Sequence, residues 1–225
     1  MKVVISGYGK MGRMVEKILA QKNIECAGCS ESITDFDKTL AKESVCIDFT
    51  TPAAFKDNYK FLAENFKAVV VGTTGWADIH DEVVGYFKEC GTTMIYASNF
   101  SIGVNVFFAV AGYASSLLGK TGGYDSYIVE KHHCHKLDAP SGTAKSLADI
   151  VETNMKQNVD VSSVRCGEIP GIHTVGFEGL NDRITLTHEA FSREGFAAGA
   201  VEAAVMTEGL EGVHEFKDII LKGCI

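Results

Sequence analysis

Three glycines near the N-terminus constrain the fold of this chain more than any other feature. Gly7, Gly9 and Gly12 follow a short apolar run at residues 3–6, and apolar residues then recur at helical spacing over residues 11–19. In a strand–turn–helix unit of this kind, the first glycine permits a tight turn and the second lets the backbone approach a pyrophosphate. The third lets the helix pack closely against the strand. The pattern predicts a dinucleotide-binding unit, with a glycine-rich turn of purely structural origin as the alternative.

The rest of the first hundred residues continues this alternation of strands and helices. Thr51 can cap a helix that has Pro52 at its first position, where a missing N–H costs nothing. The further strands expected lie at residues 24–29, 45–49, 68–71 and 94–96. Strands that alternate with helices predict an α/β fold with a doubly wound, parallel sheet over residues 1 to about 100.

Glu31 lies just past the second expected strand, where an acid accepts hydrogen bonds from the adenosine ribose hydroxyls of a dinucleotide. Ser32 follows it, whereas a 2′-phosphate would need a guanidinium nearby. Lys10 or Lys38 can supply positive charge, so NADH and NADPH both remain open as cofactors, with NADH favoured.

The second half of the chain has a different pattern. Extended runs at residues 127–131, 172–177 and 183–189 predict an α+β unit with a largely antiparallel sheet. One helical pattern opens at Ser141, and a separate one covers residues 196–209. The apolar segment 102–118 is marginal in length for a membrane span and has no flanking basic anchor, so we expect a buried helix and no membrane.

Charge and composition exclude several classes of function. The 225 residues carry a net charge of −8 with no evident basic face, which argues against nucleic-acid binding. The N-terminal apolar run is too short for a secretion signal. The seven cysteines, treated as scattered single thiols, favour a reducing compartment. We therefore expect a cytoplasmic protein without a disulfide framework.

The segment VEKHHCHKLDAPSGTA, residues 129–144, concentrates groups suited to acid–base chemistry and anion binding. Ser141 is a good N-cap, so Gly142 and Thr143 offer backbone N–H groups at a helix start. Lys136 adds a point charge, and a histidine has the right pKa range to transfer a proton at neutral pH. Together with a dinucleotide, this pattern predicts hydride transfer coupled to protonation of an anionic substrate.

Two simpler interpretations of this segment compete with the catalytic one. In an extended strand, His133 and His135 share one face, and His132 and Cys134 share the other. No second cluster at metal-ligand spacing supplies further ligands, so we assign no metal. A purely structural role, with the histidines half exposed at a strand end, is the other alternative.

The same segment resembles the signature of the dihydrodipicolinate (4-hydroxy-tetrahydrodipicolinate) reductase family, in which an acid precedes two histidines, a spaced lysine and then DAPSGTA. The resemblance extends over nearly the whole chain. Its other landmarks are residues 7–12, Asp48-Phe49-Thr50, the GTTG loop at 72–75, and the segments 97–105 and 192–200.

This resemblance implies a fold, a reaction and an assembly. Family members reduce a small cyclic dicarboxylate imine with NADH or NADPH on the route to diaminopimelate and lysine, and they are cytoplasmic homotetramers. The implied architecture is a Rossmann-type nucleotide domain at residues 1–100 and 193–225. An α+β domain with a mainly antiparallel sheet is inserted at residues 101–192 for substrate binding and oligomerisation.

The resemblance also implies site residues. His132 matches the general acid/base of the family and Lys136 its second proton donor, and which of them delivers the proton stays open. The substrate-binding positions implied are His133, Gly142 and Thr143. The nucleotide-binding positions implied are Gly7, Tyr8, Gly9, Lys10, Met11, Gly12, Glu31, Gly72, Thr73, Thr74, Ala97, Ser98, Asn99 and Phe100.

Other functions remain compatible with the pattern. One is another NAD(P)-dependent imine or amino-acid dehydrogenase of the same two-domain plan, which would prefer monocarboxylates. A second is a non-catalytic NADH-sensing protein, which would not need Lys136 or the DAPSGT turn. The chain is short for the family, so we also expect trimmed loops.

Overall fold

The computed structural model describes residues 1–222, and the chain divides into two compact units. Unit 1 comprises Met1–Ile102 together with the segment from Glu194 onward, and unit 2 comprises Gly103–Arg193. Each unit has its own sheet; unit 1 has a hydrophobic core on each face of its sheet, and unit 2 has one core. Unit 1 is therefore discontinuous in sequence, whereas unit 2 is a single uninterrupted segment.

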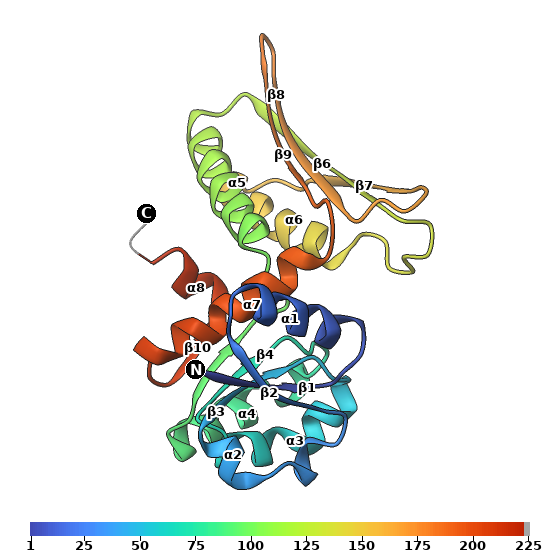
Figure 1. Cartoon of the computed structure of the whole chain (residues 1–225). Coiled ribbons are helices and arrows are strands. Elements are labelled where there is room, and N and C mark those ends of the chain that lie inside the picture. Colours follow the sequence, from blue (N-terminus) through green and yellow to red (C-terminus); the bar gives the residue numbers. More distant parts are fainter. Residues whose placement is uncertain (223–225) are drawn as a thin grey trace. The chain divides into compact units, whose positions relative to one another are not determined.

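Unit 1 is built on a six-stranded sheet in the order β10-β5-β4-β3-β1-β2, in which all neighbouring strands are parallel (Figure 1). The strand order reverses between β1 and β3, so the predicted doubly wound, Rossmann-type arrangement is confirmed. The strands are β1 (Lys2–Ser6), β2 (Glu25–Ser30), β3 (Ser44–Asp48), β4 (Ala68–Val71), β5 (Thr93–Tyr96) and β10 (Val213–Glu215).

Helices cover both faces of this sheet, as the alternation of buried side chains along β1 requires. Val3 and Ile5 point to the core beneath α1 and α7, whereas Val4 points to the core beneath α3 and α4. The helices of unit 1 are α1 (Lys10–Gln21), α2 (Lys38–Lys42), α3 (Pro52–Asn65), α4 (His80–Cys90), α7 (Glu194–Met206) and α8 (Phe216–Ile220).

Unit 2 contains a four-stranded sheet in the order β7-β6-β8-β9. The β6–β8 and β8–β9 pairs are antiparallel, and β7 alone runs parallel to its neighbour β6. A parallel neighbour needs a crossover connection, and helix α6 provides it. The elements are α5 (Ile102–Thr121), β6 (Tyr124–His132), α6 (Gly142–Met155), β7 (Asp160–Arg165), β8 (Ile172–Gly179) and β9 (Arg183–Glu189).

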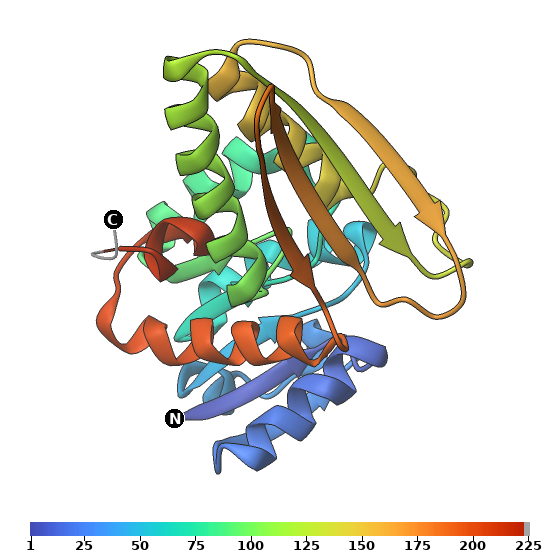
Figure 2. The same ribbon diagram turned by 90° about the horizontal axis from the view of Figure 1, so that it is seen from above.

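Helices α5 and α6 pack on one face of the four-stranded sheet (Figure 2). By length and composition alone, α5 is the one helix in residues 1–222 that could cross a membrane. Its Phe107 and Ala111 are buried in the core of unit 2, whereas Val110 and Tyr113 are exposed. The expectation of a buried helix is therefore correct for one face of α5 and wrong for the other.

The two predicted helix starts have the expected caps. The Thr51 hydroxyl accepts a hydrogen bond from the Ala54 N–H at 3.2 Å, with Pro52 at the first helical position. The Ser141 hydroxyl accepts one from the Ala144 N–H at 3.1 Å. Each cap satisfies a backbone N–H that has no partner within its helix.

Some sequence expectations need correction. Strand β7 was not predicted because its sequence, DVSSVR, is polar and largely exposed, and β10 was missed because it has only three residues. The last predicted helix ends at Met206 and continues as a 3₁₀ turn, Thr207–Gly209. The assumption of scattered cysteines is wrong for Cys26 and Cys29, whose sulfur atoms lie 3.8 Å apart.

Two helical glycines of unit 1 should respond oppositely to substitution by alanine. A Cβ on Gly199 in α7 would lie 1.7 Å from the Phe100 carbonyl oxygen, whereas a Cβ on Gly85 in α4 would meet no atom within 4 Å. We expect Gly199→Ala to lower the free energy of unfolding by about 1–3 kcal/mol through overpacking. Gly85→Ala should raise it by roughly 0.5–1 kcal/mol through helix propensity. Urea unfolding measures both, and equal effects of the two variants would contradict this packing.

Candidate active site

The carboxyl ends of the parallel strands in unit 1 carry most of the residues that the sequence analysis assigned to a cofactor. Ligands of doubly wound sheets bind at this edge, where the strand order reverses. Backbone hydrogen bonds with N···O distances of 2.8–3.2 Å tie the strand ends together: Gly7 to Ser30, Phe49 to Ser6, Gly72 to Asp48 and Ala97 to Val71. The structure thus brings the glycine turn, the end of β2 and the loops after β4 and β5 to one edge.

Steric contacts within the protein explain two glycines of the turn but not the third. Gly7 has a φ of +88°, and a Cβ there would lie 2.4 Å from the Phe49 carbonyl oxygen. A Cβ on Gly12 would lie 2.2 Å from the carbonyl oxygen of Gly7, whereas one on Gly9 would meet no atom within 4 Å. Helix α1 begins after Gly9 with no side-chain cap and no acid in its first turn. The open space and uncapped N–H groups fit a pyrophosphate.

The other predicted residues of this region surround the turn. Glu31 is exposed and follows directly on Ser30, the residue that pairs with Gly7. Lys10 is exposed at the start of α1, and Met11 packs partly against the core. Tyr8 is partly buried, and its hydroxyl donates a hydrogen bond to the carboxylate of Glu16. Tyr8 is thereby anchored to α1, a contact that the sequence pattern did not indicate.

A cavity of about 190 Å³ lies beside the loops after β4 and β5. Four residues predicted to contact a nucleotide line it: Thr73, Thr74, Ala97 and Ser98. Gly72 precedes this set, and Asn99 and Phe100 follow it, with Phe100 buried. The cavity also has an aromatic wall that sequence reasoning missed, made of Trp76, His80 and Tyr96, with the His80 ring stacked on Trp76 at 5.7 Å.

A buried carboxylate fixes the loop that follows β4. Asp48 is fully buried and accepts hydrogen bonds from the hydroxyls of Ser6 at 2.7 Å, Thr50 at 3.0 Å and Thr73 at 2.5 Å. Burial raises the pKa of Asp48 above its usual range, and these hydrogen bonds oppose the shift. Asp48 therefore orients Thr73 at the edge of the cavity, a role that the sequence analysis did not assign.

In unit 2, β6 carries an acid and a histidine on its buried face. Ser126, Ile128, Glu130 and His132 alternate with less buried residues, so all four point to the interior. The Glu130 carboxylate contacts Nδ1 of His132 and forms two hydrogen bonds with the Arg165 guanidinium, at 2.7 and 2.9 Å. It also accepts a hydrogen bond from the backbone N–H of Ser141 at 3.2 Å. One carboxylate thus holds β6, β7 and the start of α6 together.

The ionisation of this cluster follows from its burial and its partners. Burial alone would raise the pKa of Glu130, but hydrogen bonds from Arg165, Ser163 and His132 outweigh it and lower the pKa to about 2. Burial lowers the pKa of His132, with Glu130 opposing the shift. The carboxylate therefore stays charged and accepts a hydrogen bond from the Nδ1–H of His132, which leaves Nε2 of His132 as the nitrogen for proton transfer.

Nε2 of His132 lies beside two residues that sequence reasoning missed. Gly171 has a φ of +155°, which side chains rarely adopt, and a Cβ there would crowd Nε2 at 3.1 Å. His173 packs edge-to-face on His132 with ring centroids 5.1 Å apart, and its Nε2 lies 3.0 Å from the Ser141 hydroxyl. Burial, followed by the neighbouring His132, lowers the pKa of His173 to about 4. His173 is therefore uncharged at pH 7, and its ring packs against the ring of His132.

The remaining predicted residues follow the end of β6. The strand ends at His132, so the alternation expected for His133 and His135 does not apply. His133 is partly buried, and its Nδ1 is buried with no hydrogen-bond partner among the described residues. The Arg193 guanidinium lies 3.4 Å from its Nε2. His135 is exposed.

Lys136 is not a free cation in this structure. Its Nζ lies 2.7 Å from the carboxylate of Asp138, and the backbone N–H of Gly142 also donates to that carboxylate. The hydrogen bond from Lys136 lowers the pKa of Asp138. Thr143 follows in the first turn of α6. The predicted anion-binding groups therefore do converge, and an internal carboxylate occupies the position between Lys136 and Gly142.

Glu130 and Asp48 lie within the family landmarks but have no role assigned from the sequence, although both left signals in it. Glu130 is an acid at an inward position of a strand with period-two alternation, and Asp48 ends an apolar strand. Arg165 left none, because the polar strand that carries it was not predicted. Gly171 and His173 become functional neighbours only through the pairing of β8 with β6.

Comparisons with known proteins agree with this arrangement. A family model described as the N-terminus of dihydrodipicolinate reductase matches residues 1–100, and one described as its C-terminus matches residues 103–220. A 4-hydroxy-tetrahydrodipicolinate reductase of Christiangramia forsetii is 36% identical over 98% of both chains. One of Archaeoglobus fulgidus is also 36% identical, over 91% of this chain and 93% of its own.

A solved structure is similar in fold. The dipicolinate-bound dihydrodipicolinate reductase of Paenisporosarcina sp. TG-14 has a TM-score of 0.82 at 22% identity, over 97% of this chain and 99% of its own. A diaminopimelate dehydrogenase of C. glutamicum has a TM-score of 0.58 at 14% identity, over 97% of this chain and 93% of its own.

The contacts of Glu130 should make the protein sensitive to acid. Its pKa of about 2 in the folded chain lies below the ordinary 4.5, so its contribution to folding is complete above pH 4.5 and is lost as the pH falls towards 2. The shift corresponds to about 3 kcal/mol. We expect Glu130→Gln to lower the free energy of unfolding by about this amount at pH 7, with a smaller difference from wild type at pH 3.

Urea unfolding at a series of pH values measures this effect. Glu178→Gln removes an exposed acid that pairs with Arg183, and it should change stability by less than about 0.5 kcal/mol at every pH. A loss for Glu130→Gln that stays constant from pH 7 to pH 3 would show that the charge of Glu130 is not the source of its contribution.

Proposed function

We propose that His132 and Lys136 are the acid–base residues of this chain. The chain belongs to the dihydrodipicolinate reductase family and reduces 4-hydroxy-tetrahydrodipicolinate with NAD(P)H in lysine biosynthesis. The observation that carries this assignment is the buried contact of Glu130 with Nδ1 of His132. It orients the imidazole and leaves Nε2 for proton transfer, the arrangement by which a carboxylate prepares a catalytic histidine.

We propose that unit 1 holds the cofactor along its carboxyl edge. The uncapped start of α1 and the open side of Gly9 would receive the pyrophosphate, and Glu31 would accept hydrogen bonds from the adenosine ribose. Thr73, Thr74, Ala97 and Ser98 would contact it from the wall of the cavity. When bound, the reduced nicotinamide supplies the hydride, and the residues of this chain provide binding, orientation and protons.

The groups around α6 suit a dicarboxylate. Lys136 and the Gly142 N–H already bind one carboxylate, that of Asp138, which supports their assignment to a substrate carboxylate. A carboxylate of the substrate would take the place of Asp138. His133, with a buried nitrogen that has no partner among residues 1–222, is available for a second polar contact. Thr143 would complete this set.

Proton delivery would depend on the charge of the substrate. Burial keeps His132 largely neutral at pH 7, whereas two substrate carboxylates nearby would favour its protonated form. The Glu130 carboxylate would stabilise the resulting imidazolium from the Nδ1 side. Lys136 is the second donor within the same segment, and kinetics of single variants separate the two contributions.

We further propose a cytoplasmic homotetramer. One face of the four-stranded sheet packs on α5 and α6, and the opposite face, which includes Thr174 and Thr187, is available for another copy. The exposed Leu180 and Ile184 lie at the turn end of the β8–β9 hairpin. Sedimentation of a monomer at micromolar concentration would refute this assembly.

Substitution of either proposed proton donor should reduce turnover. We expect His132→Ala and Lys136→Ala each to lower kcat by about 10²- to 10⁴-fold, because each removes a positioned acid. His135→Ala is the matched control, since His135 is an exposed histidine of the same segment, and it should keep kcat within about twofold of wild type. NADH oxidation with the dicarboxylate substrate measures all three. Folded His132→Ala and Lys136→Ala proteins with wild-type kcat would exclude the assignment.

The residue pair Glu31-Ser32 should set the choice of cofactor. A carboxylate at the ribose repels a 2′-phosphate, and Ser32 cannot form a bidentate pair with it. We expect kcat/KM with NADH to equal or exceed that with NADPH, and Ser32→Arg to shift the ratio towards NADPH. Glu31→Ala should weaken NADH more than NADPH. A strong preference of the wild type for NADPH that Glu31→Ala leaves unchanged would show that Glu31 does not contact the ribose.

A further inference from the structure

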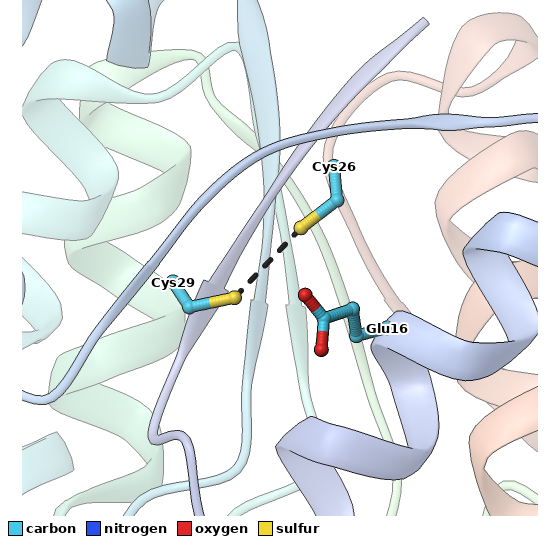
Figure 3. Close-up of side chains that lie close together, drawn as sticks. All are labelled: Glu16, Cys26 and Cys29. Atoms are coloured by element: carbon cyan, nitrogen blue, oxygen red, sulfur yellow. Dashed lines mark hydrogen bonds between the residues drawn. The ribbon is translucent and has the colours of Figure 1, made fainter.

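Outside the proposed cofactor and acid–base sites, three side chains of unit 1 converge on one point. Cys26 and Cys29 of β2 place their sulfur atoms 3.8 Å apart, and the Glu16 carboxylate of α1 approaches both (Figure 3). One potential ligand atom of each side chain lies within 4.8 Å of the other two. Both cysteines are partly buried free thiols. None of these three residues is among the proposed acid–base residues.

A β-bulge in β2 creates this convergence. Two strand residues that are three positions apart normally point to opposite faces of a sheet. In this sheet Val3 pairs with Cys26 but Val4 pairs with Gly28, so Ala27 is an extra residue without a partner on β1. Both cysteines consequently point to the face covered by α1, where they pack with Val3 and Ile5. Bulges re-aim side chains in this way next to functional sites.

The spacing of the sulfur atoms matches a tetrahedral metal. With Zn–S bonds of about 2.3 Å and tetrahedral angles, two thiolates on one zinc ion lie about 3.8 Å apart. A carboxylate oxygen is the third ligand type that zinc accepts, and Tyr8 already orients the Glu16 carboxylate through its hydroxyl. Three protein ligands leave a fourth position for water.

A disulfide fits this geometry less well. The two cysteines pair with residues two apart on β1, so their Cβ atoms are separated by about two strand steps, roughly 6–7 Å. A disulfide needs Cβ atoms about 3.5–4.5 Å apart, which this strand reaches only by moving its backbone.

We propose that Glu16, Cys26 and Cys29 form a binding site for a zinc-like divalent cation in unit 1. Thiolate ligands select soft or borderline metals such as zinc over magnesium or calcium. A second group, Cys134, His135 and Glu168 in unit 2, also has converging ligand atoms, but all three side chains are exposed and none is fixed by a strand pair or helix. It therefore serves as the comparison for the first group.

Cobalt(II) titration of the reduced full-length protein tests the proposal, because thiolate ligation gives cobalt a near-ultraviolet charge-transfer band. We expect one equivalent to bind with this band and zinc(II) to displace it. Cys26→Ser and Cys29→Ser should each abolish the band, and Glu16→Gln should weaken binding by roughly 10- to 100-fold. Cys134→Ser and Cys90→Ser, the latter at an exposed cysteine of α4, should leave it unchanged.

Three results would overturn the site. One is the absence of a thiolate–cobalt band in the wild type. Another is a band that survives Cys26→Ser and Cys29→Ser but disappears in Cys134→Ser. The third is loss of the Cys26 and Cys29 thiols on treatment with oxidised glutathione without any metal binding, which would indicate a disulfide. Circular dichroism confirms that each variant is folded. None of the three ligands is a proposed cofactor or acid–base residue, so this outcome is independent of the catalytic assignments.

Discussion

The buried carboxylate of Glu130 is the interaction on which the organisation of unit 2 depends. It joins three consecutive elements, because Arg165 comes from β7, Ser141 from the start of α6 and His132 from β6 itself. A buried charge is tolerated only when it is paired and fully hydrogen bonded, and here each partner also has a place in the site. The requirement to satisfy Glu130 therefore sets the orientation of His132 and the position of the helix that offers N–H groups to an anion. Stability and chemistry share one set of contacts in this unit.

Unit 1 meets a different constraint, which is to keep polar backbone groups open at the edge of its sheet. Gly7 and Gly12 are required by contacts within the protein, but Gly9 is not, and the N–H groups after it lack a cap. Asp48 provides the rigid part, since its buried carboxylate fixes the Thr73 hydroxyl at the next loop. In unit 2 the corresponding groups are already occupied, because Asp138 binds both Lys136 and Gly142. Unit 1 therefore presents an open anion site, whereas in unit 2 the carboxylate of Asp138 occupies the predicted anion site.

The fold could be predicted because its signals are local. The glycine turn, the apolar strands and the caps at Thr51 and Ser141 each depend on a few neighbouring residues, and the structure has all of them. The features that escaped prediction depend on pairing between distant segments. The partners of Glu130 lie on β7, whose polar sequence resembles a loop, and the convergence of Cys26 with Cys29 depends on a register shift against β1. Likewise, the salt bridge of Lys136 with Asp138 requires a loop conformation that residue spacing does not determine.

The discontinuity of unit 1 has a consequence for how the chain is made. During synthesis, β1 to β5 leave the ribosome long before α7 and β10, yet α7 supplies Ala197, Ala200 and Val201 to the core beside β1 and β3, and β10 pairs with β5. Unit 2, by contrast, is complete once Arg193 has emerged. Because domains fold as units during synthesis, the segment in the middle of the chain can fold first. On the face beneath α7, the nascent N-terminal strands would then be covered by α1 alone, so part of their apolar surface would stay exposed until α7 is synthesised.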